Sequence, residues 1–423
     1  MKKKLLTSIL KTIIFSVSLF AQRQPTTGHS ITNDVGIESY VFGGQKSDGS
    51  LSNELWLTSD FQSFKLVTNL GPSARKNHDA WIFQGKLYIK GGVDALGNCI
   101  DDLWEFDLLT ETWTKYTDHA PYCSFKKRII KLGGNLYIAG GSDSSGASVS
   151  KFGSRNLMNI SSGYTSKADM IEPLSGCGIF KKNGNIFLFG GYNHDWDAGT
   201  PGNQPSYSKN IWRYNVSSNF WDLAKAKKSG INELTDMAYT QDSLENFFYV
   251  FGGKTYNYDT KTEIYSDEIY KLDLNTFSWT KYSSKLPYGI AEFTATYKHG
   301  TSSNTDTIFL IGGKTASGLI SNNVFKFLPS TGQIITVPLS TSINEYALNN
   351  DKISIYPNPA NNILFIKNAD KNSTVIIYDS NGKQLINSNL QNEQINISEI
   401  PNGFYIIIIK SDNYEIIKRF IKN

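Results

Sequence analysis

Two segments of the chain combine aromatic rings with amide and carboxylate side chains, a composition that suits the binding of sugars. The first contains Asn193, Asp195 and Trp196, and the second contains Tyr256 and Tyr258. A sugar ring has an apolar C–H face that packs on an aromatic ring, and hydroxyl groups that hydrogen-bond to nearby polar side chains. Trp196, Tyr256 and Tyr258 are therefore candidate ligand-binding residues. The alternative is that these rings pack only against their own loops.

Charged residues that precede apolar runs form a second set of candidates. These are Arg75 and His78, Arg128, and Glu292. A glutamate that moves a proton, beside an arginine that holds an anion, would suit an enzyme acting on sugar acids. For Arg75 and His78 the alternative role is hydrogen bonding at the start of a strand.

The sequence predicts neither a metal site nor a cofactor site. The five histidines are scattered without a ligand motif, at positions 29, 78, 119, 194 and 299. The segment from Asp195 through Asp197 to Gly199 partly resembles a calcium loop but lacks the glutamate that such a loop needs. No serine-hydrolase elbow, zinc helix or phosphate loop occurs in the sequence.

The elements that would position the candidate residues repeat along the chain. Six Gly-Gly pairs each close a run of β-branched and aromatic residues, which predicts a buried strand. The pairs are Gly43-Gly44, Gly91-Gly92, Gly140-Gly141, Gly190-Gly191, Gly252-Gly253 and Gly312-Gly313. In five units a second apolar run follows, and seven residues after its last member stands another large apolar residue. These five residues are Phe64, Trp113, Trp221, Trp279 and Ile334. The constant spacing predicts one hairpin register, from which the third unit departs because Asn159 occupies that position.

This pattern resembles the kelch repeat over about residues 25 to 340, and the resemblance implies an all-β fold with a six-bladed β-propeller. The alternative is a β-sandwich with coincidental Gly-Gly turns. In a propeller, the Gly-Gly loops and the starts of the innermost strands are expected to share one rim around the central channel. The charged residues expected at that rim are Arg75, His78, Lys126, Lys127, Arg128, Glu233, Asp236 and Glu292.

The N-terminal segment has the pattern of a secretory signal peptide. Lys2, Lys3 and Lys4 precede an apolar stretch, and the expected cleavage site follows Ala21. Lys11 interrupts the stretch, so a membrane-spanning helix is less favoured and the mature chain is expected to lack a transmembrane segment. The formal charge of +4 includes these three lysines and Lys11, so the mature chain carries 4 − 4 = 0. Nucleic-acid binding is therefore not expected.

The three cysteines do not form the framework of a disulfide-rich protein. Their odd number leaves at least one thiol that is free or bonded to another chain. The repeat alignment allows Cys99 and Cys123 to be neighbours on one face, and it leaves open whether they form a disulfide or remain free thiols.

The C-terminal part of the chain has a different composition and predicts a small β-sandwich. After a polar linker at 341–350, residues 351–423 contain about seven short apolar runs. They include a Tyr-Pro-Asn-Pro element at 356–359, a turn at 379–382, a Gly-Phe-Tyr segment at 403–405 and a basic end. This order resembles the type A C-terminal sorting domain of the type IX secretion system. The resemblance implies export by that machinery, removal of the domain by a sortase-like protease, and a bacterium with two membranes.

These observations predict four segments: a signal peptide at 1–21, a kelch propeller at 22–340, the linker, and the sorting domain. The expected function is a secreted or surface-displayed module that binds a glycan or a protein. One alternative is an enzyme such as a sialic-acid mutarotase with its site at the channel mouth. Another is a structural surface protein without a specific ligand.

Overall fold

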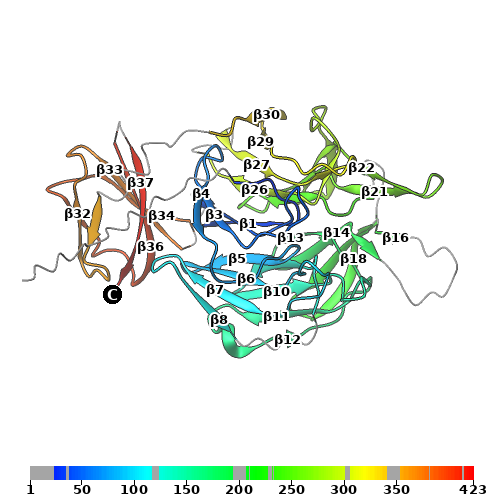
Figure 1. The fold of residues 1–423 in the computed structure, drawn as a ribbon. Coiled ribbons are helices and arrows are strands. Elements are labelled where there is room, and N and C mark those ends of the chain that lie inside the picture. The colour runs from blue at the N-terminus through cyan, green and yellow to red at the C-terminus, as the bar shows by residue number, and fades with distance from the viewer. Residues whose placement is uncertain are drawn as a thin grey trace, which may run out of the picture.

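The computed structural model of the chain describes residues 23–34, 38–116, 123–193, 206–208, 210–226, 231, 233–300, 305–340, 353–380, 382–411 and 414–423. These residues form a ring of six sheets and a small C-terminal domain that lies at one end of it (Figure 1). One short 3-10 helix, η1 (Ile160–Ser162), is present among them. None of the helices in this part of the chain has the length and apolar character needed to cross a membrane.

Each sheet of the ring consists of four antiparallel strands that follow one another along the chain. Blade 1 contains β1 (Ser30–Asp34), β2 (Glu38–Phe42), β3 (Leu55–Thr58) and β4 (Lys65–Thr68). Blade 2 contains β5 (Asp79–Phe83), β6 (Lys86–Lys90), β7 (Leu103–Asp107) and β8 (Thr112–Tyr116). Blade 3 contains β9 (Arg128–Leu132), β10 (Asn135–Ala139), β11 (Phe152–Asn156) and β12 (Thr165–Ser166).

The second half of the ring repeats this arrangement. Blade 4 contains β13 (Gly178–Lys182), β14 (Asn185–Phe189), β17 (Asn210–Asn215) and β18 (Phe220–Ala226). Blade 5 contains β19 (Ala238–Gln241), β20 (Phe247–Phe251), β23 (Ile269–Asp273) and β24 (Ser278–Lys281). Blade 6 contains β26 (Thr294–Lys298), β27 (Thr307–Ile311), β29 (Val324–Leu328) and β30 (Gln333–Val337). The predicted six-bladed all-β propeller is confirmed.

The seven-residue spacing found in the sequence corresponds to direct cross-strand pairs. Trp113 pairs with Phe106, Trp221 with Tyr214, Trp279 with Leu272 and Ile334 with Phe327. In blade 1 the register is shifted by one residue, so Leu57 pairs with Lys65, because the loop between β3 and β4 is longer than the corresponding loop of blade 2. A β-bulge between Leu55 and Trp56 shifts the pairing once more, farther from the turn. In blade 3 the helix η1 takes the place of the regular hairpin, as the departure at Asn159 indicated.

Six hydrophobic clusters hold the ring together, and each lies between two adjacent blades. Successive side chains of a strand point to opposite faces of its sheet, so each blade contributes to two clusters. In β2, Tyr40 and Phe42 pack toward blade 2, whereas Val41 packs toward blade 6 against Phe309 and Ile311. Blades 1 and 6 therefore close the ring by side-chain packing and share no strand.

Three two-stranded ribbons extend beyond the blades. They are β15 (Tyr192–Asn193) with β16 (Ser206–Tyr207), β21 (Lys254–Asn257) with β22 (Thr262–Tyr265), and β25 (Ile290–Ala291) with β28 (Lys314–Thr315). The β21–β22 ribbon extends from the end of the propeller opposite the C-terminal domain (Figure 1).

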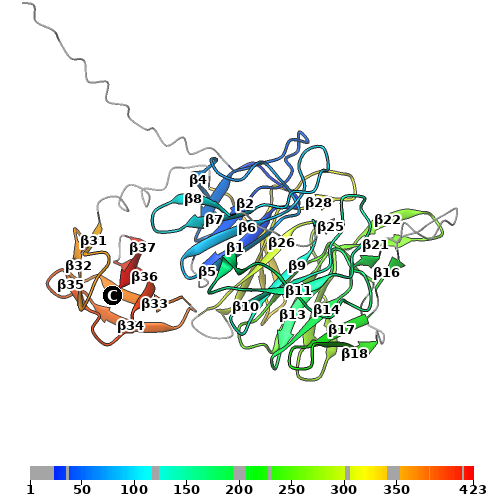
Figure 2. The same cartoon turned by 90° about the horizontal axis from the view of Figure 1, so that it is seen from below.

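The C-terminal domain has two facing sheets and its own hydrophobic core, which includes Leu364, Ile407 and Phe420 (Figure 2). One sheet contains β31 (Ser354–Tyr356), β32 (Ile363–Lys367) and β35 (Gln394–Asn396). The other contains β34 (Gln384–Asn389), β33 (Thr374–Asp379), β36 (Gly403–Lys410) and β37 (Glu415–Lys422). The boundaries predicted for the signal peptide and linker lie outside the described residues.

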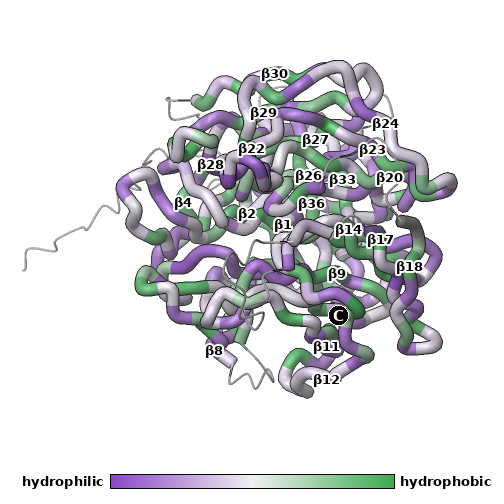
Figure 3. The backbone as a smooth tube through the Cα atoms, turned by 90° about the vertical axis from the view of Figure 1, so that its right-hand side faces the viewer, coloured by the Kyte–Doolittle hydropathy of each residue, from purple (hydrophilic) through white to green (hydrophobic). Residues whose placement is uncertain are grey.

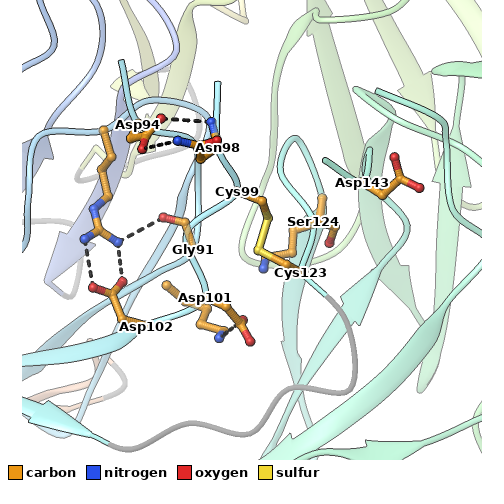
Figure 4. The surroundings of a disulfide bond; sticks show 12 residues. Gly91, Asp94, Asn98, Cys99, Asp101, Asp102, Cys123, Ser124 and Asp143 are labelled. Atoms are coloured by element: carbon orange, nitrogen blue, oxygen red, sulfur yellow. Dashed lines mark hydrogen bonds and ion pairs between the residues drawn. A yellow bond between two sulfur atoms is a disulfide. The ribbon is translucent and has the colours of Figure 1, made fainter. Parts of the chain in front are cut away.

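Cys99 and Cys123 form a disulfide, so of the two outcomes left open by the sequence the bonded one is present. The Cα atoms lie 6.0 Å apart, and the bond joins the loop after the second Gly-Gly pair to the segment entering blade 3 (Figure 4). Cys177 is a free thiol buried in the wall of blade 4, and burial raises its pKa to about 11. A disulfide of this kind persists in oxidising compartments, which agrees with export from the cell.

Candidate functional site

Six residues at the starts of the innermost strands form a closed ring of backbone hydrogen bonds. They are Gly28, Asn77, Lys126, Gly176, Asp236 and Glu292. The N–H of each donates to the carbonyl oxygen of its counterpart in the preceding blade, with N···O distances of 2.7 to 3.2 Å, and Gly28 donates to Glu292 to close the circle. All six have φ between 52° and 66°, the left-handed region that glycine and asparagine tolerate best. Figure 3 views the propeller from this end of the channel.

The Gly-Gly loops lie on the same rim as this ring, as the repeat alignment predicted. In blade 1, for example, Thr27 precedes the ring residue and pairs with Gln45, which follows the Gly-Gly pair. The second glycine of a pair also donates a hydrogen bond to the next blade, as Gly44 does to the carbonyl of Arg75 at 2.8 Å. We call this end of the propeller the Gly-Gly face.

An ion cluster covers the centre of the channel mouth. Lys126 Nζ lies 2.8 Å from Asp236 Oδ2 and 3.2 Å from Glu292 Oε1, and Lys254 Nζ lies 3.7 Å from the same Asp236 oxygen. Burial disfavours the charged amine of Lys126, but the two carboxylates outweigh burial and raise its pKa well above the usual range. The Lys126 ammonium in turn lowers the pKa of Glu292. Glu292 is therefore ionised at neutral pH, and each of the two carboxylates has an ammonium group beside it.

A cavity of about 290 Å³ lies along the channel at this mouth, and its lining includes the predicted residues His78, Arg128 and Glu292. Arg128 donates from Nη1 to the Lys127 carbonyl at 3.1 Å and from Nε to the Cys177 carbonyl. Its guanidinium carbon lies 5.7 Å from the centre of the Tyr239 ring. The structure thus brings three of the four charged candidates to one place.

Arg75 is not part of this lining. Its side chain is fully buried inside blade 2, where it forms an ion pair with Asp102 and donates to the Gly91 carbonyl at 3.0 Å (Figure 4). All of its polar atoms are engaged within the blade, so its place in the structure matches the alternative role in hydrogen bonding. Arg75 is therefore not available to a ligand in the channel.

The aromatic candidates lie on the ribbons of the Gly-Gly face. Tyr256 and Tyr258 stand edge to face, with ring centres 5.4 Å apart, and 48% of the surface of Tyr258 is exposed. On the neighbouring ribbon Tyr192 and Tyr207 have ring centres 6.5 Å apart. Trp196 lies outside the described residues.

The comparison with known families decides the classification of the propeller. Residues 40–325, more than half of the chain, match the Attractin/LZTR1 beta-propeller family. The chain belongs to this family. Residues 354–423 match the secretion-system C-terminal sorting domain, which confirms the sorting domain predicted from the sequence. The protein is therefore an Attractin/LZTR1-type propeller with a signal for export through type IX secretion.

Curated relatives of this propeller come from plants and animals. Acyl-CoA-binding domain-containing protein 5 of Arabidopsis thaliana is 29% identical over 44% of this chain and 30% of its own length. Kelch domain-containing protein 3 of Rattus norvegicus is 24% identical over 45% of this chain and 52% of its own length. The chain thus spans about a third to a half of these relatives. A solved structure, described as the structure of YjhT, covers 74% of this chain and 97% of its own with a TM-score of 0.58 at 15% identity, which shows the same propeller fold.

Three residues of the channel mouth are not among the ligand-binding candidates predicted from the sequence. The sequence places Lys126 and Asp236 at the rim without a role, and it does not single out Asn77. Aligning the repeats on their Gly-Gly pairs would have shown glycine or asparagine at one position in three of the six blades. Such residues mark a left-handed backbone position, which here is the hydrogen-bonded ring.

Burial of His78 predicts a loss of stability in acid. Its Nε2 lies 2.8 Å from Ser30 Oγ, and burial, followed by the neighbouring Arg75 guanidinium, lowers its pKa to about 3. Below pH 6.5 the unfolded chain therefore binds a proton that the folded chain does not, and His78 costs about 2 kcal/mol of stability at pH 5. In urea titrations at pH 7 and pH 5, His78→Gln should lose less stability than the wild type. His299→Gln, at a half-exposed histidine, should lose as much stability between pH 7 and pH 5 as the wild type. If the two variants lost equal amounts of stability, the lowered pKa of His78 would not be the cause of the loss in acid.

Proposed function

We propose that the propeller is exported to the surface of a two-membrane bacterium, or released from it, and binds a glycan on its Gly-Gly face. The observation that carries the proposal is the row of tyrosines on the ribbons of blades 4 and 5. Tyr192, Tyr207, Tyr256 and Tyr265 belong to these ribbons, and Tyr258 follows β21 directly. Tyrosine supplies an apolar face for a sugar ring and a hydroxyl that hydrogen-bonds to it.

The Gly-Gly face also offers polar groups that a sugar can use. Lys76 Nζ donates to Gln45 Oε1 at 2.8 Å, and both side chains are partly exposed. Amide and ammonium groups can exchange such a bond for bonds to a ligand hydroxyl. Tyrosine rings on the same face as polar side chains are an arrangement that suits a sugar ring.

The charges at the mouth favour a glycan that carries carboxylate or sulfate groups. Lys126 and Lys254 pair with Asp236 and Glu292, while Lys76 and Lys314 flank them from blades 2 and 6. Burial lowers the pKa of Lys76, and although Glu292 opposes this shift, the ammonium groups of Lys126 and Lys314 add to it. An anionic group bound between Lys76 and Lys314 would relieve their mutual repulsion.

The alternative of a sugar-acid enzyme finds less support in this geometry. Such an enzyme needs a group that exchanges protons near neutral pH beside an arginine that holds the acid. Lys126 lowers the pKa of Glu292 and keeps it ionised, and Arg75 is engaged by Asp102 inside the blade. Binding without catalysis is therefore the function that we propose.

Replacing Tyr258 by alanine should weaken glycan binding with little change in stability. Removal of an exposed aromatic contact from the centre of a binding surface costs about 2 kcal/mol, or roughly thirtyfold in Kd. The experiment screens the purified protein on an array of neutral and acidic glycans and measures the best ligand by calorimetry. Tyr356→Ala, at an exposed tyrosine of the sorting domain, serves as the matched control and should bind as the wild type.

The outcomes separate the parts of the proposal. Binding of acidic glycans that is lost in Tyr258→Ala supports it in full. Binding of neutral glycans alone would contradict the charge argument, whereas an array without any binding would contradict glycan recognition and favour a protein ligand or a structural role.

A further inference from the structure

The sorting domain contacts the face of the propeller opposite the Gly-Gly face. Figure 1 shows it against that end, and in Figure 3 its strands β33 and β36 lie behind the centre of the ring. The contacts involve β2 of blade 1 and the β5–β6 turn of blade 2. These elements belong to the inner hairpins of two adjacent blades.

The central contact is a buried ion pair. Arg419 on β37 pairs through Nη2 with the carboxylate of Glu38, and their side chains are only 12% and 10% exposed. The same nitrogen donates to the Tyr40 hydroxyl at 2.8 Å, and the guanidinium carbon lies 6.0 Å from the centre of the Tyr40 ring. Arginine supplies several donors in one plane, so it can satisfy a carboxylate and a hydroxyl together.

One further contact accompanies this pair. Phe404 on β36 packs directly on Gly85, where an added Cβ would lie 2.3 Å from the aromatic ring. The absence of a side chain at Gly85 is thus what lets the phenyl ring approach. The two domains also interact electrostatically: burial lowers the pKa of Lys298 in blade 6, and the charge of Glu415 on β37 partly opposes this shift.

The signature segments of the sorting domain are close to this contact surface. Asn358 of the Tyr-Pro-Asn-Pro element donates to the Arg419 carbonyl at 3.2 Å and accepts from the Ile421 N–H at 2.9 Å. These two hydrogen bonds join Asn358 to β37, the strand that carries Arg419. Phe404 belongs to the Gly-Phe-Tyr segment that also marks the domain in the sequence.

We propose that Glu38, Tyr40 and Gly85 form a docking site on the propeller for the sorting domain, and that the domain stays bound after the linker is cut. The docking site combines a carboxylate and an aromatic ring that bind one arginine with a glycine that accommodates one phenyl ring. Proteolysis between the domains then yields a non-covalent complex, and separation is a second step. Release of the domain exposes the docking site on the mature propeller.

The experiment uses the full chain with a site for a specific protease placed in the linker at 341–350. After complete cleavage at about 10 µM, the two fragments should co-elute in size-exclusion chromatography, which corresponds to a Kd below about 10 µM. Glu38→Gln and Arg419→Gln should each separate the fragments, with release at least about a hundredfold faster, because each leaves a buried charge without its partner. The double charge exchange, Glu38→Arg with Arg419→Glu, should restore part of the retention.

Matched controls are Lys383→Gln and Glu399→Gln, which change exposed charges elsewhere on the sorting domain. They should leave retention unchanged, and circular dichroism of each uncut variant checks that both domains are folded. Immediate separation of the wild-type fragments would overturn the proposal. So would retention of folded Glu38→Gln and Arg419→Gln fragments at the wild-type level.

Discussion

Replacing Trp221 by alanine is expected to lower the free energy of unfolding by about 3 to 5 kcal/mol. Trp221 is only 2% exposed, contacts Phe152 and Tyr214, and donates from Nε1 to the Ala168 carbonyl of blade 3 at 2.9 Å. The substitution removes the largest ring from the interface between blades 3 and 4 and leaves that carbonyl without its donor. Urea denaturation of both proteins measures the effect.

Leu223→Ala is the matched control because Leu223 lies on the same strand and is 47% exposed. A surface change of this kind usually stays within about 0.5 kcal/mol. If Trp221→Ala were no more destabilising than Leu223→Ala, the result would contradict the burial of Trp221 between blades 3 and 4.

Deleting residues 351–423 is expected to abolish export and leave the propeller folded in the periplasm of its native host. The match of residues 354–423 to the sorting domain motivates this result, and the separate core of that domain explains why the propeller should survive its loss. Cell fractionation with immunoblotting follows the location. Protease resistance of the periplasmic material shows that it is folded.

A chain with Glu399→Gln alone should be exported normally, because that side chain is exposed and makes no contact with the core. Secretion of the deleted chain at the normal level would refute the sorting role. Loss of the protein from every fraction would instead show that the propeller depends on the domain for its stability.

The fold could be predicted from the sequence because each blade repeats a local signal. The spacing from Phe106 to Trp113 is set by one hairpin, and the same hairpin recurs in other blades. The one-residue shift in blade 1 was not predictable, since the longer loop between β3 and β4 leaves no mark in the hydrophobic pattern. The hairpin spacing in the sequence thus predicts the regular blades, whereas the shifted register of blade 1 becomes visible only in the structure.

The candidate site was less accessible to sequence reasoning, because the partner of a charged side chain depends on contacts between distant segments. Arg75 and Arg128 both precede apolar runs and looked equivalent. Asp102, 27 residues along the chain, holds the first inside blade 2, while the second reaches the Cys177 carbonyl in the next blade. Likewise, only the relative positions of blades 2 and 3 could decide the disulfide between Cys99 and Cys123.

The closed circle of six backbone hydrogen bonds has an electrostatic consequence. At the end of an α-helix the peptide dipoles point along the axis and create a partial charge that selects anions or cations. In the circle each N–H points to the preceding blade around the channel, so the dipoles run head to tail and their sum along the channel axis is close to zero. The six bonded peptide groups therefore add no partial charge along the channel, unlike the end of a helix. For the glycan binding proposed above, this leaves the charge preference to side chains such as Lys76 and Lys314, and substitutions there should change it without altering the circle.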